Sequence, residues 1–186
     1  MPILSPAVKN KQLREFYFNR IDQKLEVRLI GIRTATDLNS VLICSQDRSS
    51  RIRREVAKRL KDWADFSLVR ESLVNLLHDQ DPQVRWFSAL SLSCGDITKI
   101  RSTIEKLLSS TKLESWLLAS VIQRSIVLPE VKPLLVKGLD GPEGIKNLAL
   151  VMLARGGEIN LVGKFAYDPS PAIREAVFSL LAPSQP

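Results

Sequence analysis

The side chains that most often carry acid–base, nucleophilic or metal chemistry are few in this sequence. It has one histidine, His78, and two cysteines, Cys44 and Cys94. A general base usually needs a histidine that a carboxylate orients towards a nucleophile. His78 is instead expected at a helix C-terminus, where an imidazole complements the helix dipole. One histidine and two distant cysteines cannot furnish a tetrahedral zinc site. The sequence therefore predicts no catalytic residue, no metal site and no bound cofactor.

Acidic and basic residues nevertheless recur with a regular spacing. In five places an aspartate is followed, after four residues, by an aliphatic residue and then by a basic one. The aspartates are Asp22, Asp47, Asp79, Asp140 and Asp168, and the basic residues are Arg28, Arg53, Arg85, Lys146 and Arg174. Such regular repetition is typical of a scaffold and not of an acid/base array. We expect a structural ladder, in which each aspartate accepts N–H groups of its turn and each basic residue bridges to a neighbouring repeat.

The best candidate for binding is a basic stripe within residues 48–61. Four of its cations follow helical spacing, opposite an apolar side made of Ile52, Val56, Leu60 and Trp63. The stripe consists of Arg48, Arg51, Arg54, Lys58 and Lys61. Residues 1–61 hold 14 Lys/Arg and 6 Asp/Glu, whereas residues 62–186 hold 13 and 14. The stripe either binds an anionic partner or forms a solvated face that keeps the protein soluble. Arg14, Arg20, Lys24 and Arg33 would extend it.

The aspartates also reveal the elements that must position these side chains. Their steps are 25, 32, 61 and 28 residues, so the long step covers two periods, with a degenerate copy near residues 109–127. Each unit of about 30 residues reads as two helices. Asp81 and Ser170 are predicted N-caps, each followed by a proline at the first helical position. The predicted fold is all-α, with about six helical hairpins in one domain over 1–186 and flexible ends at about 1–8 and 183–186.

Two of these copies carry a family resemblance. Asp79-Gln80-Asp81-Pro82-Gln83-Val84-Arg85-Trp86-Phe87-Ser88-Ala89-Leu90 and Asp168-Pro169-Ser170-Pro171-Ala172-Ile173-Arg174-Glu175-Ala176 are similar to the HEAT-repeat consensus. The other copies are looser: the one at Asp140 has a Gly-Pro-Glu-Gly turn, and the one near Thr111 lacks the aspartate. The resemblance implies an α-solenoid whose second helices line a concave face. It is specific for the fold and says little about function.

Composition places the chain among ordinary globular proteins of a reducing compartment. Hydrophobic residues make up 45% and charged residues 25%. No apolar run reaches the roughly 18 residues of a membrane span, and the start does not read as a secretory signal. Cys44 and Cys94 lie in apolar helical segments and are predicted to be buried thiols. Trp63 and Trp86 are predicted to pack in the core. The predicted location is cytoplasmic.

Three functions follow from these features. The first is a non-catalytic scaffold or adaptor, which binds another protein, favoured to be acidic, on its concave surface. The second is nucleic-acid binding through the basic first third, with the HEAT-like alkylpurine DNA glycosylases as the extreme case. The third rests on the resemblance alone, because short repeats of this style occur in phycobilin lyases and phycobilisome-related proteins.

Overall fold

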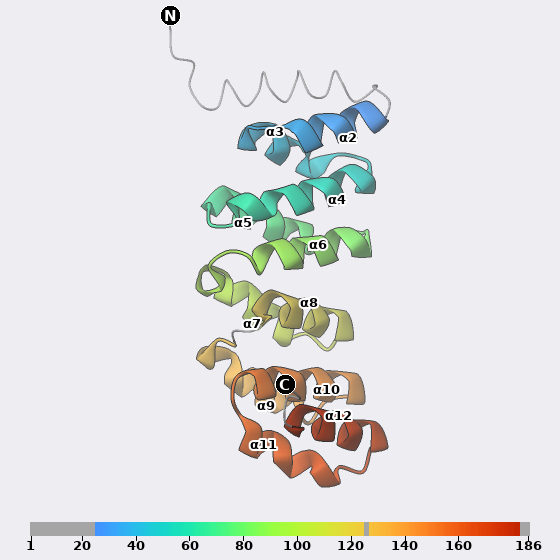
Figure 1. Ribbon diagram of the computed structural model, residues 1–186, viewed down its shortest axis with the longest axis vertical. Coiled ribbons are helices and arrows are strands. Elements are labelled where there is room, and N and C mark those ends of the chain that lie inside the picture. Colours follow the sequence, from blue (N-terminus) through green and yellow to red (C-terminus); the bar gives the residue numbers. More distant parts are fainter. Residues whose placement is uncertain (1–24, 125–126, 183–186) are drawn as a thin grey trace, which may run out of the picture. The chain divides into compact units, whose positions relative to one another are not determined.

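The computed structural model describes residues 25–124 and 127–182, whose regular structure is entirely helical (Figure 1). This confirms the predicted all-α class. The described residues belong to two compact units, the first ending at Asp96 and the second beginning at Ile97. A single domain over 1–186 stays a prediction. The flexible ends predicted at 1–8 and 183–186 lie outside the described residues, as does Asp22.

The first unit stacks three helices in one layer and two behind it. Helix α4 (Ser50–Arg59) packs between α2 (Leu25–Thr34) and α6 (Pro82–Leu92), which makes one layer (Figure 1). Behind this layer, α3 (Leu38–Ile43) contacts α4, and α5 (Ser67–Leu76) contacts α6. The short 3-10 helix η1 (Cys44–Gln46) lies between α3 and α4 in the chain, and η2 (Leu60–Trp63) lies between α4 and α5. The largest side chains that are fully buried between the two rows are Ile52, Leu60, Leu73, Leu77 and Leu92.

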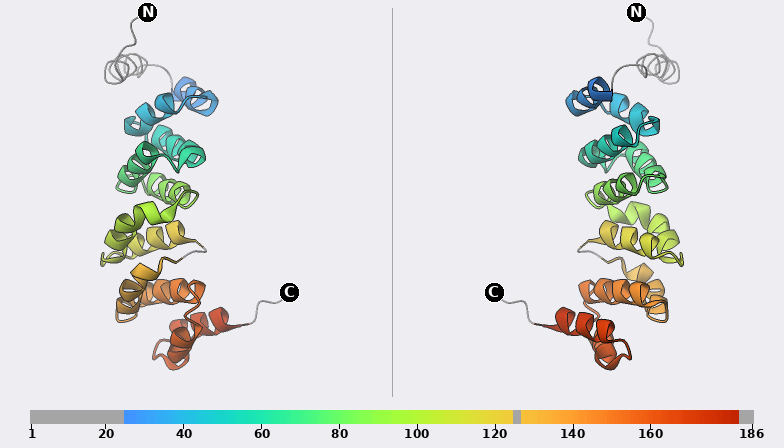
Figure 2. Two further views of the ribbon diagram at one scale, coloured as in Figure 1. Left: turned by 90° about the vertical axis from the view of Figure 1, so that its left-hand side faces the viewer. Right: turned by 90° about the vertical axis from the view of Figure 1, so that its right-hand side faces the viewer.

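The second unit repeats this order of paired helices. Its pairs are α7 (Arg101–Leu108) with α8 (Leu113–Gln123), α9 (Lys132–Gly138) with α10 (Glu143–Arg155), and α11 (Ile159–Gly163) with α12 (Pro171–Leu181). Helix α10 contacts both α8 and α12, as the side views of this unit also show (Figure 2). Three 3-10 helices, η3 (Ile97–Ile100), η4 (Pro129–Val131) and η5 (Lys164–Tyr167), precede α7, α9 and α12. Its core includes Ile104, Ile122, Leu135, Leu150, Met152, Leu153 and Ile173.

Local sequence sets where several of these helices begin and end. The Asp81 side chain accepts the N–H of Gln83, with Pro82 at the first helical position, and Ser170 caps α12 ahead of Pro171 in the same manner. Both predicted caps are confirmed. Gly156 is the C-cap of α10, and Gly157 follows with φ 84°, a left-handed conformation that glycine adopts without strain.

Two predictions of burial were wrong. Cys44 is buried as expected, but Cys94 is exposed because it follows the end of α6. Neither Cys44 nor Cys94 is part of a disulfide. Trp86 is also exposed, with 38% of its surface accessible, because it lies on the side of α6 opposite the buried Val84 and Ser88. Among the described helices, none combines the length and the apolar character of a membrane span.

Candidate binding surface

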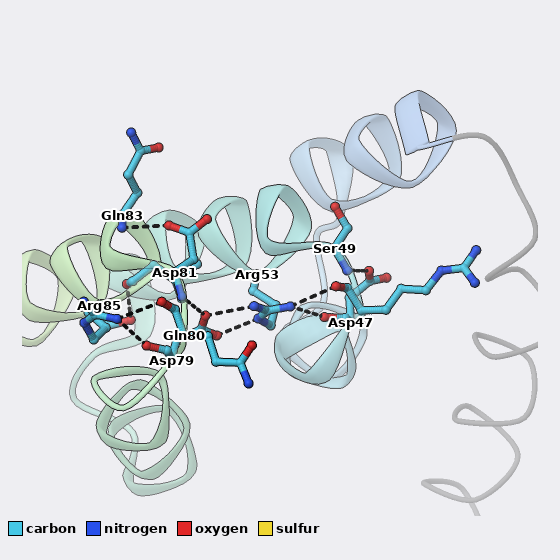
Figure 3. A network of polar contacts seen from close by, with 11 residues as sticks. Asp47, Ser49, Arg53, Asp79, Gln80, Asp81, Gln83 and Arg85 are labelled. Atoms are coloured by element: carbon cyan, nitrogen blue, oxygen red, sulfur yellow. Dashed lines mark hydrogen bonds and ion pairs between the residues drawn. The ribbon is translucent and has the colours of Figure 1, made fainter.

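In three copies, the turn before the second helix is held by the ladder arginine of that same copy. Arg53 Nη1 donates to the carbonyl oxygens of Asp47 and Arg48, at 2.7 and 3.2 Å (Figure 3). Arg85 donates in the same way to Asp79 and Gln80, at 2.6 and 3.0 Å. Arg174 repeats the pair with Asp168 and Pro169, at 2.8 and 3.0 Å. Three copies of the pattern therefore build the same turn.

The ladder aspartates complete this turn from the other side. Their Oδ1 atoms accept the backbone N–H two residues further along. Asp47 accepts from Ser49 at 2.7 Å, Asp79 from Asp81 at 2.8 Å, and Asp168 from Ser170 at 2.9 Å. These N–H bonds fix the direction of each carboxylate independently of the cation that it binds.

Each of three ladder cations then reaches the aspartate of the next copy along the chain. Arg53 binds Asp79 in a bidentate manner, with Nε to Oδ2 at 2.6 Å and Nη2 to Oδ1 at 2.8 Å (Figure 3). Arg28 Nε lies 3.6 Å from Asp47 Oδ2, and both side chains are buried. Lys146 Nζ donates to Asp168 Oδ2 at 3.1 Å. These contacts tie one hairpin to the next and fix α4 beside α6.

The protonation of the ladder follows from these contacts. Burial, the largest effect, raises the pKa of Asp79, but hydrogen bonds from Arg53 and the N–H of Asp81 and the Arg53 charge together bring this pKa below its ordinary value. The bond to Asp79 raises the pKa of Arg53. The pKa of Asp168 is lowered, chiefly by the N–H of Ser170 and further by Lys146. These aspartates are ionised acceptors at neutral pH, which suits a structural role.

The ladder is incomplete at one described copy. Asp140 is exposed, and no contact of its carboxylate with a ladder cation is found within residues 25–124 and 127–182. One copy earlier, in the degenerate repeat, Trp116 stands at the place of the ladder cation: it is the fourth residue of α8, and its Nε1 donates to the Ser110 carbonyl oxygen as Arg85 donates to that of Asp79. The loss of that cation accounts for the free Asp140 carboxylate.

The basic stripe has its centre on the outer side of α4. Arg51, Arg54 and Lys58 lie opposite the buried Ile52, Val56 and Ala57. Arg48 lies in the preceding turn and Lys61 in η2, both exposed. The side chains of Arg51 and Lys58 are 55% and 42% exposed, so about half of each remains open to a partner.

Neighbouring helices place carboxylates among these cations. On the α2 side, Arg51 Nη1 lies 3.5 Å from Glu26 Oε1, and Arg33 Nε lies 3.2 Å from Glu55 Oε1. On the α6 side, the pKa of Asp81 is lowered, first by the Ser50 side chain and also by the Arg54 charge. Positive and negative groups therefore alternate across the outer face of α2, α4 and α6, which we call the α4 face.

An aromatic group belongs to the α4 face as well. Lys58 Nζ lies 4.4 Å from the centre of the Phe87 ring, a cation–π contact, and the exposed Trp86 adjoins Phe87 in the sequence. Sequence reasoning assigned Trp86 to the core because helical periodicity does not show which sides of a helix are covered. Trp63 is half-buried beneath the Arg59 guanidinium, and Trp116 is buried.

The described part of the chain gives little support for histidine catalysis or metal binding. His78 is exposed just after α5. Within residues 25–124 and 127–182, no three His, Cys, Asp or Glu side chains are grouped as a metal site requires. The ladder and the α4 face are thus the two regular polar features. A scan against protein-family models and a search of curated proteins both find no match to this chain.

Proposed function

We propose that this chain is a HEAT-repeat α-solenoid that acts as a scaffold, and that it binds an acidic segment of another protein on its α4 face. The ladder supports the architectural part of the proposal. A repeat that hides its core only by stacking on the next one needs polar contacts that fix their register. The Arg53–Asp79 and Lys146–Asp168 pairs are contacts of this kind.

The composition of the α4 face is the observation that carries the binding part. Its half-exposed arginines and its tryptophan are residue types enriched at protein interfaces. The cations at Arg51 and Lys58 give the face its affinity for carboxylates, while Trp86 offers a large flat apolar surface.

A protein partner fits this face better than a nucleic-acid backbone does. A phosphodiester strand presents only negative charge, and it would meet Glu26 and Glu55 among the cations. Residues 25–96 hold 11 Lys/Arg and 10 Asp/Glu, which is close to balance. Alternating charge of both signs favours a protein segment that places carboxylates opposite the cations and other side chains opposite Glu26 and Glu55, over a strand that is negative at every position.

The proposal predicts a specific loss of binding on charge reversal. The full chain, immobilised, is expected to retain a defined set of proteins from an extract of its own organism, and treatment with nuclease should leave that set unchanged. The double variant Arg51→Glu, Lys58→Glu should recover about ten-fold less of these proteins, because two cations that attract the acidic partner become carboxylates that repel it. Recovery is measured by quantitative mass spectrometry.

A matched control removes the effect of net charge. Lys106→Glu with Lys137→Glu reverses two exposed cations of α7 and α9 in the second unit, and it should retain the same proteins. Equal losses with both double variants, or a retained set that disappears after nuclease treatment, would contradict the proposed function.

A further inference from the structure

The cations of the α4 face have an axial spacing that a partner must match. Arg51, Arg54 and Lys58 are three and four residues apart on one helix. At a rise of 1.5 Å per residue, their Cα atoms step along the axis by about 4.5 and 6 Å, or roughly 10.5 Å in all.

Two regular backbones would present carboxylates to these cations differently. An extended segment places same-side residues about 6.6 Å apart, so three carboxylates cover about 13 Å, and the mismatch grows with every further charge. A helix with acidic residues at i, i+3 and i+7 repeats the steps of α4 itself. The stripe therefore matches a helix laid along α4.

Apolar side chains on both sides of the stripe fit the flanks of such a helix. On α2, Ile30 is 60% exposed and lies between Glu26 and Arg33, which form ion pairs with residues of α4. On α6, Trp86 is exposed beside Phe87, whose ring is under Lys58. An amphipathic helix with one acidic stripe and apolar residues beside it would cover both groups.

Breaking the existing ion pairs of the α4 face to bind this partner would cost little free energy. The Arg51–Glu26 pair is 3.5 Å long with side chains 55% and 65% exposed, and exposed pairs of this sort contribute little to stability. The partly buried Arg53–Asp79 pair, whose arginine is on the other side of α4 from the stripe, would stay intact.

From these observations we infer that the segment bound by the α4 face is an amphipathic helix, with acidic residues at i, i+3 and i+7 against Arg51, Arg54 and Lys58 and apolar residues against Ile30 and Trp86. This inference rests on the proposed function and adds the shape and the spacing of the partner.

Two synthetic peptides of identical composition test it against the full chain. One places glutamates at i, i+3 and i+7 beside leucines on a helix-forming background, and the other places the same glutamates at every second position. Fluorescence anisotropy at low salt should give an affinity about ten-fold higher for the helical peptide. Ile30→Ser with Trp86→Ser should weaken it about five-fold or more. Leu68→Ser, at an equally exposed residue of α5, should not.

The outcomes separate this inference from the proposed function. If both peptides bind equally and both lose affinity in the Arg51→Glu, Lys58→Glu variant, the helical partner is wrong and the proposed function stands. If neither peptide binds, or if a thymidine 20-mer binds more tightly than both, the proposed function fails together with the inference.

Discussion

Replacing Gly138 by alanine is expected to destabilise the second unit by about 2–3 kcal/mol, although alanine is the better helix former. A Cβ atom at this position would lie 2.3 Å from Cη2 and 2.9 Å from Cζ3 of Trp116. The indole has little freedom to move, since it is 3% exposed and its Nε1 donates to the Ser110 carbonyl at 2.9 Å. The midpoint of thermal unfolding, followed by circular dichroism, should fall by about 4–10 °C.

Two further variants isolate the contact as the cause. Gly31→Ala in α2 introduces a Cβ with no heavy atom within 4 Å, so it should leave stability unchanged or raise it by up to about 1 kcal/mol. In a Trp116→Phe background, which lacks the crowded part of the indole, Gly138→Ala should cost less. The packing described for α8 and α9 is wrong if Gly138→Ala proves as harmless as Gly31→Ala.

Arg53→Ala is expected to cost about 2–3 kcal/mol of unfolding free energy, measured by chemical denaturation. The substitution removes both bonds to Asp79 and the support of two carbonyl groups in the turn. It also removes the cation beside the Asp79 carboxylate, whose side chain is only 7% exposed. Arg53→Lys should recover part of the loss, because an ammonium cannot bind both carboxylate oxygens in the same fork.

A surface pair of similar length provides the comparison. Arg101 Nε donates to Glu105 Oε1 at 2.7 Å, but these side chains are 51% and 36% exposed, so Arg101→Ala should change stability little. Equal effects of Arg53→Ala and Arg101→Ala would show that the ladder does not hold the hairpins together. A double-mutant cycle of Arg53→Ala with Asp79→Ala should show a coupling that accounts for most of the loss.

The sequence alone was sufficient for those features that depend on neighbouring residues. The N-caps at Asp81 and Ser170, each with a following proline, are local chemistry, and α6 and α12 begin directly after them. The bond from the N–H of Ser49 to the Asp47 carboxylate is also local, as predicted for the turn, whereas the bonds from Arg53 to the carbonyl oxygens of that turn were not predicted.

Features that depend on packing between hairpins could not be predicted in this way. The repeated pattern predicted that Arg53 would bridge to a neighbouring repeat, but no pattern within one copy identifies which group accepts it, and this is the Asp79 carboxylate of the next copy. The exposure of Trp86 depends on which side of α6 the neighbouring helices cover, and the apolar periodicity of the α6 sequence does not show this. Glu26 comes beside the stripe only when α2 is placed next to α4, whereas Glu55 is on α4 itself.

Site-specific photo-cross-linking tests the central claim, that the α4 face holds the partner, most directly. A photoreactive phenylalanine analogue replaces Arg51 or Lys58 in the full chain, and in control proteins it replaces Lys106 or Lys137, which are exposed residues of the second unit. Positions 51 and 58 should form cross-links to a retained protein, through acidic peptides that mass spectrometry identifies, and positions 106 and 137 should not. Cross-links that form at 106 and 137 but are missing at 51 and 58 would contradict the claim.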